Sequence, residues 1–450
     1  YKRIRTTFEK HQYMLDGGIN DSDRRVIMDC LGDAGSDYRK HIYKQSFWGK
    51  KRTVSFNGLK RFTGATLKFI DHTIAANKRT DGLYHAYNLM TVENDKEVSI
   101  SYLSEMLEGQ VAILSSGYLS SKEALEVLNS LKASALFRED QYSYILYPNK
   151  DLPGFMFKNT IPADQVAKST VLQKLIKEGD KSVVDQDLKG AVHFNGNFKN
   201  ANDVKDALDK LSSSEKDTKE VLQIFEGVFN HKAFTGRSGT FFGYEGLGSI
   251  YWHMVSKLLL AVQEICLKAN EEKESAEVIG KLLEHYYEIN AGIGVHKSPE
   301  LYGAFPTDPY SHTPGGKGAQ QPGMTGQVKE DVLSRFGELG VFVKDAKLYF
   351  NPCLLKKDEF TIKPRVFNYV DINLQNNKVE METGSICFTY CQVPVIYTMA
   401  DSNKLAVSYS DGSIKDFDNL TLDSATSSQI FERIGEVQQI TIQLDKSILK

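Results

Sequence analysis

The sequence has few of the features that mark membrane proteins, nucleic-acid-binding proteins and metalloenzymes. Its 55 Lys and Arg residues are balanced by 58 Asp and Glu, for a formal net charge of −3. This balance leaves no basic excess for nucleic acid or an anionic membrane. The longest apolar runs, such as Leu258–Val262, are far shorter than the roughly 20 residues that span a bilayer. No His-Glu-x-x-His, Cys-x-x-Cys or calcium-loop spacing occurs. We therefore expect no metal, no nucleic acid and no membrane partner.

Cysteine is also scarce, with 5 residues in 450, an odd number without metal-type spacing. Reduced thiols of this kind are typical of cytoplasmic proteins, and we expect that location. The chain opens on Tyr1-Lys2-Arg3 and polar sequence, unlike an apolar signal peptide. Because it opens on Tyr and not on Met, we also expect an excised or processed piece. With 41% hydrophobic residues the chain can bury a large core, in about three domains or fewer.

The pattern of apolar residues changes near residue 338. Before that point, runs such as Leu103–Leu114 and Ala124–Leu131 repeat every three to four residues, which predicts helices. After it, short runs rich in β-branched and aromatic residues alternate with turn signals, which predicts strands. The interpretation is a mainly α protein with β: a helical toroid or bundle over residues 1–338, followed by a C-terminal β-sandwich-type domain over residues 339–450.

The stretch from Arg79 to Asn88 combines an acid, a histidine, an amide and two tyrosines where a helix gives way to a loop. Aromatic faces stack on pyranose rings and amides bond to hydroxyl groups, so this mixture suits sugar recognition. The candidate residues are Asp81, Tyr84, His85 and Asn88. The alternative is that Asp81 begins a turn and the tyrosines only pack.

A glycine-rich segment from Thr235 to Ser249 precedes an apolar helix. Glycine lets the backbone approach a ligand closely, and a helix N-terminus attracts anions. Arg237 is suited to hold phosphate or carboxylate in bidentate fashion, and Glu245 lies in the same turn. His253 follows one turn into the helix, where a lone histidine is more often a core residue than a ligand.

The longest loop contains His312, Gln320 and Gln321 and ends just before a helix. Thr325 and Gly326 place a hydroxyl group and a backbone amide at the start of that helix, which is an anion-binding arrangement. The glycines of this loop lack the Lys-Ser/Thr offset of a nucleotide-binding P-loop. The sequence therefore gives little support to a kinase or an ATPase.

These segments follow one another in an order that resembles a known family. The likeness is carried by Gly239–Gln263, Tyr286–Asn290, Met324–Gly326 and Leu348–Leu354. They are similar to the C-terminal portion of the inverting β-glucoside phosphorylases of the cellobiose phosphorylase family, in particular the very large bacterial members that act on β-1,2- or β-1,3-gluco-oligosaccharides. The resemblance implies part of an (α/α)6 barrel, incomplete at its N-terminal side, with β-domains attached.

The resemblance also implies a hexosyl-transferring glycoside phosphorylase that needs no organic cofactor. Inorganic phosphate, the co-substrate, attacks the anomeric carbon while one carboxylic acid protonates the glycosidic oxygen, which gives α-glucose-1-phosphate with inversion. His253 corresponds to the family's phosphate-contacting histidine, and Thr325 and Gly326 correspond to its Thr-Gly pair. Asp81 matches the place of the general acid best. Asp95 is the second choice, because the Trp-Asn-Asp motif of smaller members is absent here.

Three other interpretations stay open. A glycoside hydrolase on the same barrel needs a second carboxylate, for which Glu245 is the candidate. A non-catalytic carbohydrate-binding protein would keep the aromatic cleft and lack the acid, and a polysaccharide lyase on an α-toroid is a more distant option. For the phosphorylase, the expected partners are a β-gluco-oligosaccharide and phosphate, together with the missing N-terminal part of the same protein or a homodimer partner.

Overall fold

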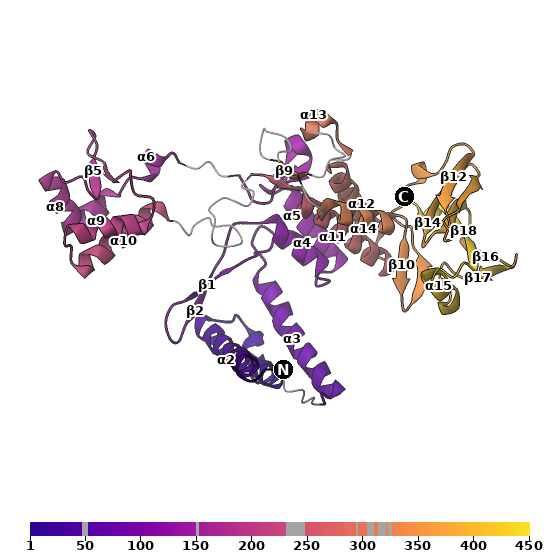
Figure 1. Ribbon diagram of the computed structural model, residues 1–450, viewed down its shortest axis with the longest axis horizontal. Helices are drawn as coiled ribbons and strands as arrows, with labels where there is room; N and C mark the ends of the chain where they lie inside the picture. Colours follow the sequence, from indigo (N-terminus) through magenta and orange to yellow (C-terminus); the bar gives the residue numbers. More distant parts are fainter. Residues whose placement is uncertain are drawn as a thin grey trace. The chain divides into compact units, whose positions relative to one another are not determined.

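The computed structural model describes residues 1–46, 53–149, 153–230, 248–293, 296–303, 310–313, 321–322 and 326–450. The chain divides into two compact units, shown with the element labels in Figure 1. The main unit comprises Tyr1–Leu146 and Ser249–Lys450, and the inserted unit comprises Tyr147–Gly248.

The main unit begins with three helices and a hairpin. Its first elements are α1 (Lys2–Lys10), the 3-10 helix η1 (Gln12–Asp16), α2 (Asp21–Gln45), α3 (Phe56–Ala76), β1 (Leu89–Val92) and β2 (Val98–Ser101). Asn20 and Ser55 begin α2 and α3 as N-caps, because their side chains accept hydrogen bonds from free backbone N–H groups of the first turn. α1 contacts both other helices, and α2 contacts β2.

Helix α11 (Trp252–Glu271) is the centre of the helical core of the main unit. The helices that contact it are α4 (Leu107–Ser115), α5 (Ser121–Lys132), α12 (Ala276–Ala291) and α14 (Gly326–Glu338). Its apolar residues recur at helical spacing, so Val255, Leu258, Leu259 and Val262 are all buried. The short elements nearby are β3 (Phe137–Arg138), the 3-10 helix η2 (Glu139–Gln141), β4 (Ser143–Tyr144) and α13 (Pro299–Tyr302).

A small antiparallel sheet lies at the start of α11. It consists of β7 (Ile250–Tyr251), β8 (Tyr310–Thr313) and β9 (Gln321–Pro322), in the order β7-β8-β9. β4 and α11 also contact β7. Strands that are distant in sequence therefore meet where the central helix begins.

The C-terminal part of the main unit is β-rich. Its elements are β10 (Val341–Lys344), β11 (Lys347–Phe350), η4 (Lys357–Glu359), β12 (Arg365–Val370), β13 (Asn376–Met381), β14 (Ser385–Tyr390), β15 (Val393–Ala400), β16 (Lys404–Tyr409), β17 (Ile414–Phe417), α15 (Ser424–Phe431), β18 (Val437–Asp445) and η5 (Lys446–Ile448). Five strands form one mixed sheet in the order β14-β15-β18-β16-β17, with β15 parallel to β18. Alternate residues such as Val395, Tyr397, Ile440 and Ile442 are fully buried on its core face. The Tyr397 hydroxyl group donates to the Leu339 carbonyl at 2.7 Å, which joins the sheet to the segment after α14.

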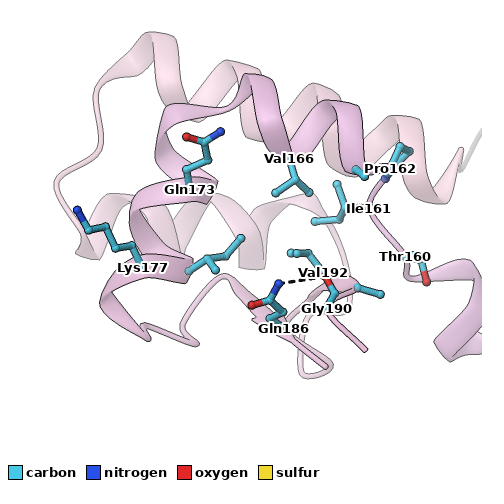
Figure 2. A pocket seen from close by; sticks show the side chains of 12 residues that line it. Thr160, Ile161, Pro162, Val166, Gln173, Lys177, Gln186, Gly190 and Val192 are labelled. Carbon is cyan, nitrogen blue, oxygen red and sulfur yellow. Dashed lines mark hydrogen bonds between the residues drawn. The ribbon is translucent and has the colours of Figure 1, made fainter. Parts of the chain in front are cut away.

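The inserted unit has its own apolar core. Its elements are α6 (Phe155–Lys158), α7 (Ala163–Lys168), α8 (Thr170–Glu178), β5 (Val184–Gln186), β6 (Val192–Phe194), α9 (Ala201–Lys210) and α10 (Glu215–Phe229). The core includes Leu172, Val204, Val221 and Phe225. Figure 2 shows a pocket of about 510 Å³ on this unit, lined mainly by apolar side chains such as Ile161, Val166 and Val192.

The structure contains both helices and sheets, so the α-plus-β character predicted from the sequence is confirmed. The (α/α)6 barrel and the β-sandwich stay predictions. The run Phe360–Ile362, which looks strand-like in the sequence, forms no strand, although Thr361 donates its N–H to Ser385 and accepts from Gly384. No helix in the described ranges combines the length and the apolar composition that crossing a bilayer requires.

Candidate active site

The loop from Arg79 to Asn88 is held against α4 by one buried amide. The Gln110 side chain is fully buried and accepts a hydrogen bond from the Tyr84 N–H at 3.0 Å. Its Nε2 atom donates to the carbonyls of Tyr84, at 2.9 Å, and Met106, at 3.0 Å. A Cβ atom at Gly109 would lie 2.9 Å from the Ala86 Cβ, so glycine permits the close approach of loop and helix. The loop is therefore fixed in place before any ligand binds.

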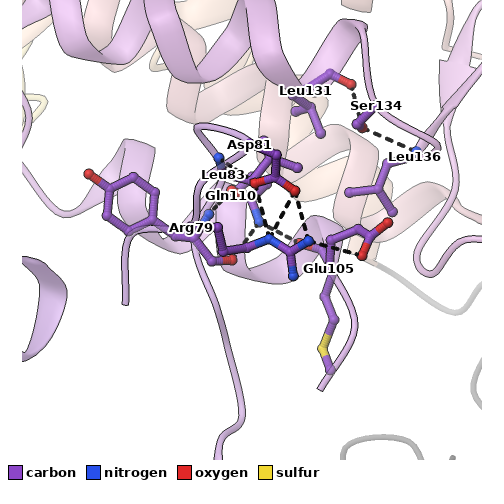
Figure 3. Close-up of polar contacts among 10 residues, drawn as sticks. Arg79, Asp81, Leu83, Glu105, Gln110, Leu131, Ser134 and Leu136 are labelled. Atoms are coloured by element: carbon purple, nitrogen blue, oxygen red, sulfur yellow. Dashed lines mark hydrogen bonds and ion pairs between the residues drawn. The ribbon is translucent and has the colours of Figure 1, made fainter. Parts of the chain in front are cut away.

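Asp81 lies in this loop as one member of an ion-pair chain (Figure 3). Its Oδ2 atom accepts from Arg79 Nη2 at 2.7 Å, and its Oδ1 atom accepts from the Leu83 N–H at 3.1 Å. The Arg79 Nη2 atom also lies 3.4 Å from Glu105 Oε2. The hydrogen bonds from Arg79 are the largest influence on the Asp81 carboxyl, and they lower its pKa despite partial burial. This arrangement keeps the carboxylate ionised.

A pocket of about 450 Å³ adjoins Asp81 and is lined by both polar and apolar groups. The other lining residues include Lys78, Tyr84, Glu123 and Glu126. Ser120 is the N-cap of α5, and the Glu123 carboxylate accepts from the Ser120 N–H in a capping box; this hydrogen bond is the largest cause that lowers the Glu123 pKa. Carboxylates and hydroxyl groups around a volume of this size suit a hydroxylated ligand such as a sugar.

His85 and Asn88 make local contacts at the far end of the same loop. The His85 ring stacks on Tyr102 with centroids 4.1 Å apart, and burial lowers the pKa of the imidazole, which favours its neutral form. Asn88 Nδ2 donates to Asn77 Oδ1 at 2.7 Å. Within the described part of the chain, the buried His85 Nδ1 and Asn88 Oδ1 atoms have no hydrogen-bond partner.

Asp95, the second candidate acid, is exposed in the turn between β1 and β2. This hairpin is held to α2, because Arg24 Nε donates to the Val98 carbonyl at 3.0 Å and Arg25 Nη1 donates to the Asn94 carbonyl at 2.8 Å. Among the residues that the structure describes, no hydrogen bond or ion pair joins Asp95 to Asp81. The structure therefore places the two candidate acids in different surroundings.

Three segments that carry predicted residues meet at the start of α11. In the small sheet, Tyr251 pairs with His312, and His312 pairs with Gln321. His253 lies in the first turn of α11, with its ring centroid 5.6 Å from that of Tyr251. The backbone pairing thus brings together the segments of His253, His312 and Gln321, although about 60 residues separate the first from the second.

Backbone hydrogen bonds connect this sheet to the start of α4. The Leu107 N–H, at the start of α4, donates to the Leu146 carbonyl at 3.1 Å. The Leu146 N–H in turn donates to the Ser249 carbonyl at 2.9 Å, directly before β7. Because Gln110 of α4 also holds the Asp81 loop, one helix links the two groups of candidate residues.

Of the remaining predicted residues, the structure describes Gly326. Gly326 is the first residue of α14, as expected for a helix start. Gln263 of α11 donates to the Ser334 carbonyl of α14 at 2.7 Å, so the helices that begin near His253 and Gly326 pack together. Arg237, Glu245, Gln320 and Thr325 lie outside the described residues. No group of three or more His, Cys, Asp or Glu side chains suited to a metal ion occurs within the described part of the chain.

Three structurally prominent residues were not among the predicted site residues. Gln110 had a signal, since it is a polar residue on the apolar face of an expected helix. Trp252, whose indole N–H donates to the Thr313 hydroxyl group at 2.8 Å, had only its place beside His253. Lys297, which is buried at 7% exposure, had none, because its burial depends on contacts distant in sequence.

One comparison with known proteins identifies a part of the chain. Residues 152–232 match the family model described as GH149 phosphorylase insertion domain 2. No curated protein sequence matches the chain. The matched residues fall within the inserted unit, which the structure shows as a compact body with its own core. The chain therefore carries a domain similar to the second insertion domain of GH149 phosphorylases, and this match supports an enzyme of the glycoside phosphorylase kind.

Proposed function

We propose that the chain takes part in inverting phosphorolysis of β-linked gluco-oligosaccharides, of the β-1,2 or β-1,3 type. Inorganic phosphate is the co-substrate and α-glucose-1-phosphate is the product. The observation that carries this proposal is the match of residues 152–232 to a phosphorylase insertion domain. The sugar class and the linkage rest on the resemblance of the main-unit segments to the cellobiose phosphorylase family.

The proposed reaction needs one protein carboxyl group. A phosphate oxygen forms a bond to the anomeric carbon while the bond from that carbon to the glycosidic oxygen breaks. The acid transfers its proton to the departing oxygen, which leaves as a hydroxyl group of the shortened sugar. Phosphate occupies the place that water and its general base occupy in an inverting hydrolase, so a second carboxylate is unnecessary.

We propose Asp81 as this acid, with Asp95 as the alternative. In favour of Asp81 are its pocket of about 450 Å³ and its place in a rigid loop. Its contact with Arg79 holds the carboxyl group ionised, so protonation requires that Arg79 release it. Glu105 is the carboxylate near enough to take over the guanidinium, at 3.4 Å from Arg79 Nη2. In this proposal, sugar binding in the pocket moves the Arg79 guanidinium from Asp81 to Glu105.

We propose that phosphate binds where α11 and α14 begin. His253, Thr325 and Gly326 are the proposed contacts, and Arg237 is an additional candidate cation. Helix N-termini favour anions because their first N–H groups have no partner within the helix. The segment packing around β7 and β8 supports a common location for His253 and His312. Tyr84, His85, Asn88, Glu245, Gln320 and Gln321 are the proposed sugar contacts.

We further propose that the main unit is part of an (α/α)6 barrel with a β-sandwich-type domain, that it works in the cytoplasm, and that it needs neither metal nor organic cofactor. The contacts of α11 with four other helices are compatible with a place in such a barrel.

The experiment measures release of α-glucose-1-phosphate from β-1,2- and β-1,3-gluco-oligosaccharides, with Asp81→Asn, Asp95→Asn and wild type compared. The exposed Asp71→Asn on α3 is the matched control. Loss of the general acid lowers the rate by about 10² to 10⁴-fold, and we expect this loss in Asp81→Asn alone. Equal activity of Asp81→Asn and Asp71→Asn would exclude Asp81, and a loss confined to Asp95→Asn would assign the role to Asp95. Reducing sugar released without phosphate would indicate a hydrolase.

A further inference from the structure

Lys297 is a buried cation in the main unit, between α12 and α13. Its side chain is 7% exposed. The Nζ atom donates to the Gln141 carbonyl and lies 4.9 Å from the centroid of the Trp252 ring. None of the carboxylates in the described ranges forms an ion pair with it, and Arg138 and Asp140 are the charged groups that influence it most.

The surroundings of Lys297 oppose its charge. Burial is the main cause that lowers the pKa of the ammonium group, to about 8, and the neighbouring Arg138 lowers it further. Asp140 offsets part of this effect, although that carboxylate is already paired with Arg138, at 2.8 Å from its Nε atom. The Lys297 ammonium group loses its hydration on burial and gains contacts with only one carbonyl and one aromatic ring. The cost of desolvation therefore exceeds what these contacts contribute to stability.

The aromatic face belongs to the residue that joins the strands to the central helix. Trp252 is the first residue of α11, directly after β7 and directly before His253. Its indole N–H donates to the Thr313 hydroxyl group at 2.8 Å, and Thr313 pairs with Ile250 across β8 and β7. The Trp252 ring also meets Tyr302 of α13 edge to face, with centroids 5.2 Å apart. Lys297 thus contacts the junction of β7, β8 and α11.

We propose that Lys297 is a positioning residue, whose ammonium group on the Trp252 indole fixes the first turn of α11 and thereby holds His253 in the orientation that binds phosphate. This inference rests on the proposed function for the identity of the anion. A cation is held over an indole face only while it is charged, so protonated Lys297 orders the junction and neutral Lys297 does not.

A spectroscopic test isolates the junction. The chain has only 2 Trp residues, so Trp48→Phe leaves Trp252 as the single indole reporter. In that background the Trp252 emission is recorded from pH 6 to pH 10, with and without Lys297→Met. We expect a transition near pH 8 that disappears in the Lys297→Met protein, because the indole senses loss of the nearby charge.

The functional test measures the dissociation constant of inorganic phosphate, by equilibrium dialysis, for wild type, Lys297→Met, Lys297→Arg and the exposed control Lys281→Met. An aromatic–cation contact in a desolvated place is worth about a tenfold change in binding, so we expect about tenfold weaker phosphate binding in Lys297→Met. Lys297→Arg keeps its charge at every pH and should restore most of the affinity. The ratio of wild-type to Lys297→Arg affinity should fall between pH 7 and pH 9, which a purely structural role would not produce.

The outcomes separate this inference from the proposed function. Unchanged phosphate affinity in a folded Lys297→Met protein, or an affinity ratio independent of pH, would overturn the positioning role while leaving phosphorolysis intact. Wild-type protein that releases free sugar at the same rate with and without phosphate, and forms no sugar phosphate, would overturn the proposed function. If Lys297→Met does not fold, the pH dependence of the wild type against Lys297→Arg decides the question alone.

Discussion

In both units buried polar side chains join segments that are far apart in sequence, but in the main unit the joined segments carry candidate site residues. In the inserted unit, Asn159 bonds to both backbone groups of Phe194, 35 residues further along the chain, and Ser169 caps α8. In the main unit, Gln110 holds the Asp81 loop, and the Trp252 indole bonds to Thr313. In the main unit these bonds fix the loop of Asp81 and the strands beside His253, as a site that must keep its geometry requires.

The difference separates stability from function in a way that experiments can test. The inserted unit depends on apolar packing, so changes in its core should alter unfolding and little else. The main unit combines an apolar helical core with polar contacts around the candidate site. Substitutions that remove those contacts should lower activity even in variants that remain folded.

The largest effect is expected in the core of the inserted unit. Phe225 is 3% exposed, and its ring lies 5.0 Å from that of Phe194 and 4.7 Å from that of Phe229. Phe225→Ala should lower the free energy of unfolding of this unit by about 3–5 kcal/mol, since it removes the ring and leaves a cavity. Calorimetry should show that the unfolding transition of the inserted unit shifts to lower temperature while that of the main unit does not. Phe157→Ala is the control: this residue is 82% exposed, and its substitution should leave both unfolding transitions unchanged.

Lys297 should give the main unit an unusual pH dependence. Its pKa is about 8 in the folded protein against 10.5 ordinarily, so between these values the unfolded chain binds a proton that the folded chain does not. The free energy of unfolding should therefore rise with pH through this window, by about 3 kcal/mol in all. Urea unfolding at pH 7, 8, 9 and 10 measures it. The same rise in Lys297→Met would show that another group causes it.

A smaller cost in stability is expected from the amide that holds the Asp81 loop. Gln110→Leu leaves the Tyr84 N–H and two carbonyls without their partner, which costs about 1–3 kcal/mol. Because the loop carries Asp81, the rate of α-glucose-1-phosphate release should fall by more than tenfold even where the protein is fully folded. The exposed Gln173→Leu in the inserted unit is the control. Full activity in folded Gln110→Leu would separate the loop from the chemistry.

The smallest effect is expected at a helix cap of the inserted unit. The Ser214 hydroxyl group accepts from the Asp217 N–H at 3.2 Å and begins α10. Ser214→Ala should lower the stability of this unit by about 1 kcal/mol, and Ser214→Asp should retain it. The melting temperatures of both variants are measured by thermal unfolding, monitored by circular dichroism. Equal melting temperatures for the Ala and Asp variants would show that the cap contributes nothing.

Much of the secondary structure follows from local patterns. The predicted helical run Ala124–Leu131 lies in α5, and the run Leu103–Leu114 coincides with α4 from Leu107 onward. The strand-like residues Lys404–Tyr409 form β16. These elements form where one face is consistently apolar, a property that neighbouring residues alone determine. Phe360–Ile362 does not form a strand because Pro364 follows closely. Only Thr361 of this run forms backbone hydrogen bonds with Gly384 and Ser385, which is too few for a ladder.

The arrangement of elements could not be predicted in the same way. That residues 147–248 close into a separate unit depends on which apolar faces meet, and helices such as α8 and α10 have the same local pattern as those of the main unit. Within the site, the sequence indicated Asp81 and His253 as candidates, but not the Arg79 contact that keeps Asp81 ionised. The burial of Lys297 likewise arises from Gln141 and Trp252, which no spacing rule brings together.

Phosphorolysis is measured by incubating the protein with β-1,2- and β-1,3-gluco-oligosaccharides in the presence and absence of inorganic phosphate. We predict release of α-glucose-1-phosphate that depends strictly on phosphate and that Asp81→Asn lowers by about 10² to 10⁴-fold. Release of free glucose at the same rate without phosphate, with no sugar phosphate formed, would show hydrolysis in place of phosphorolysis.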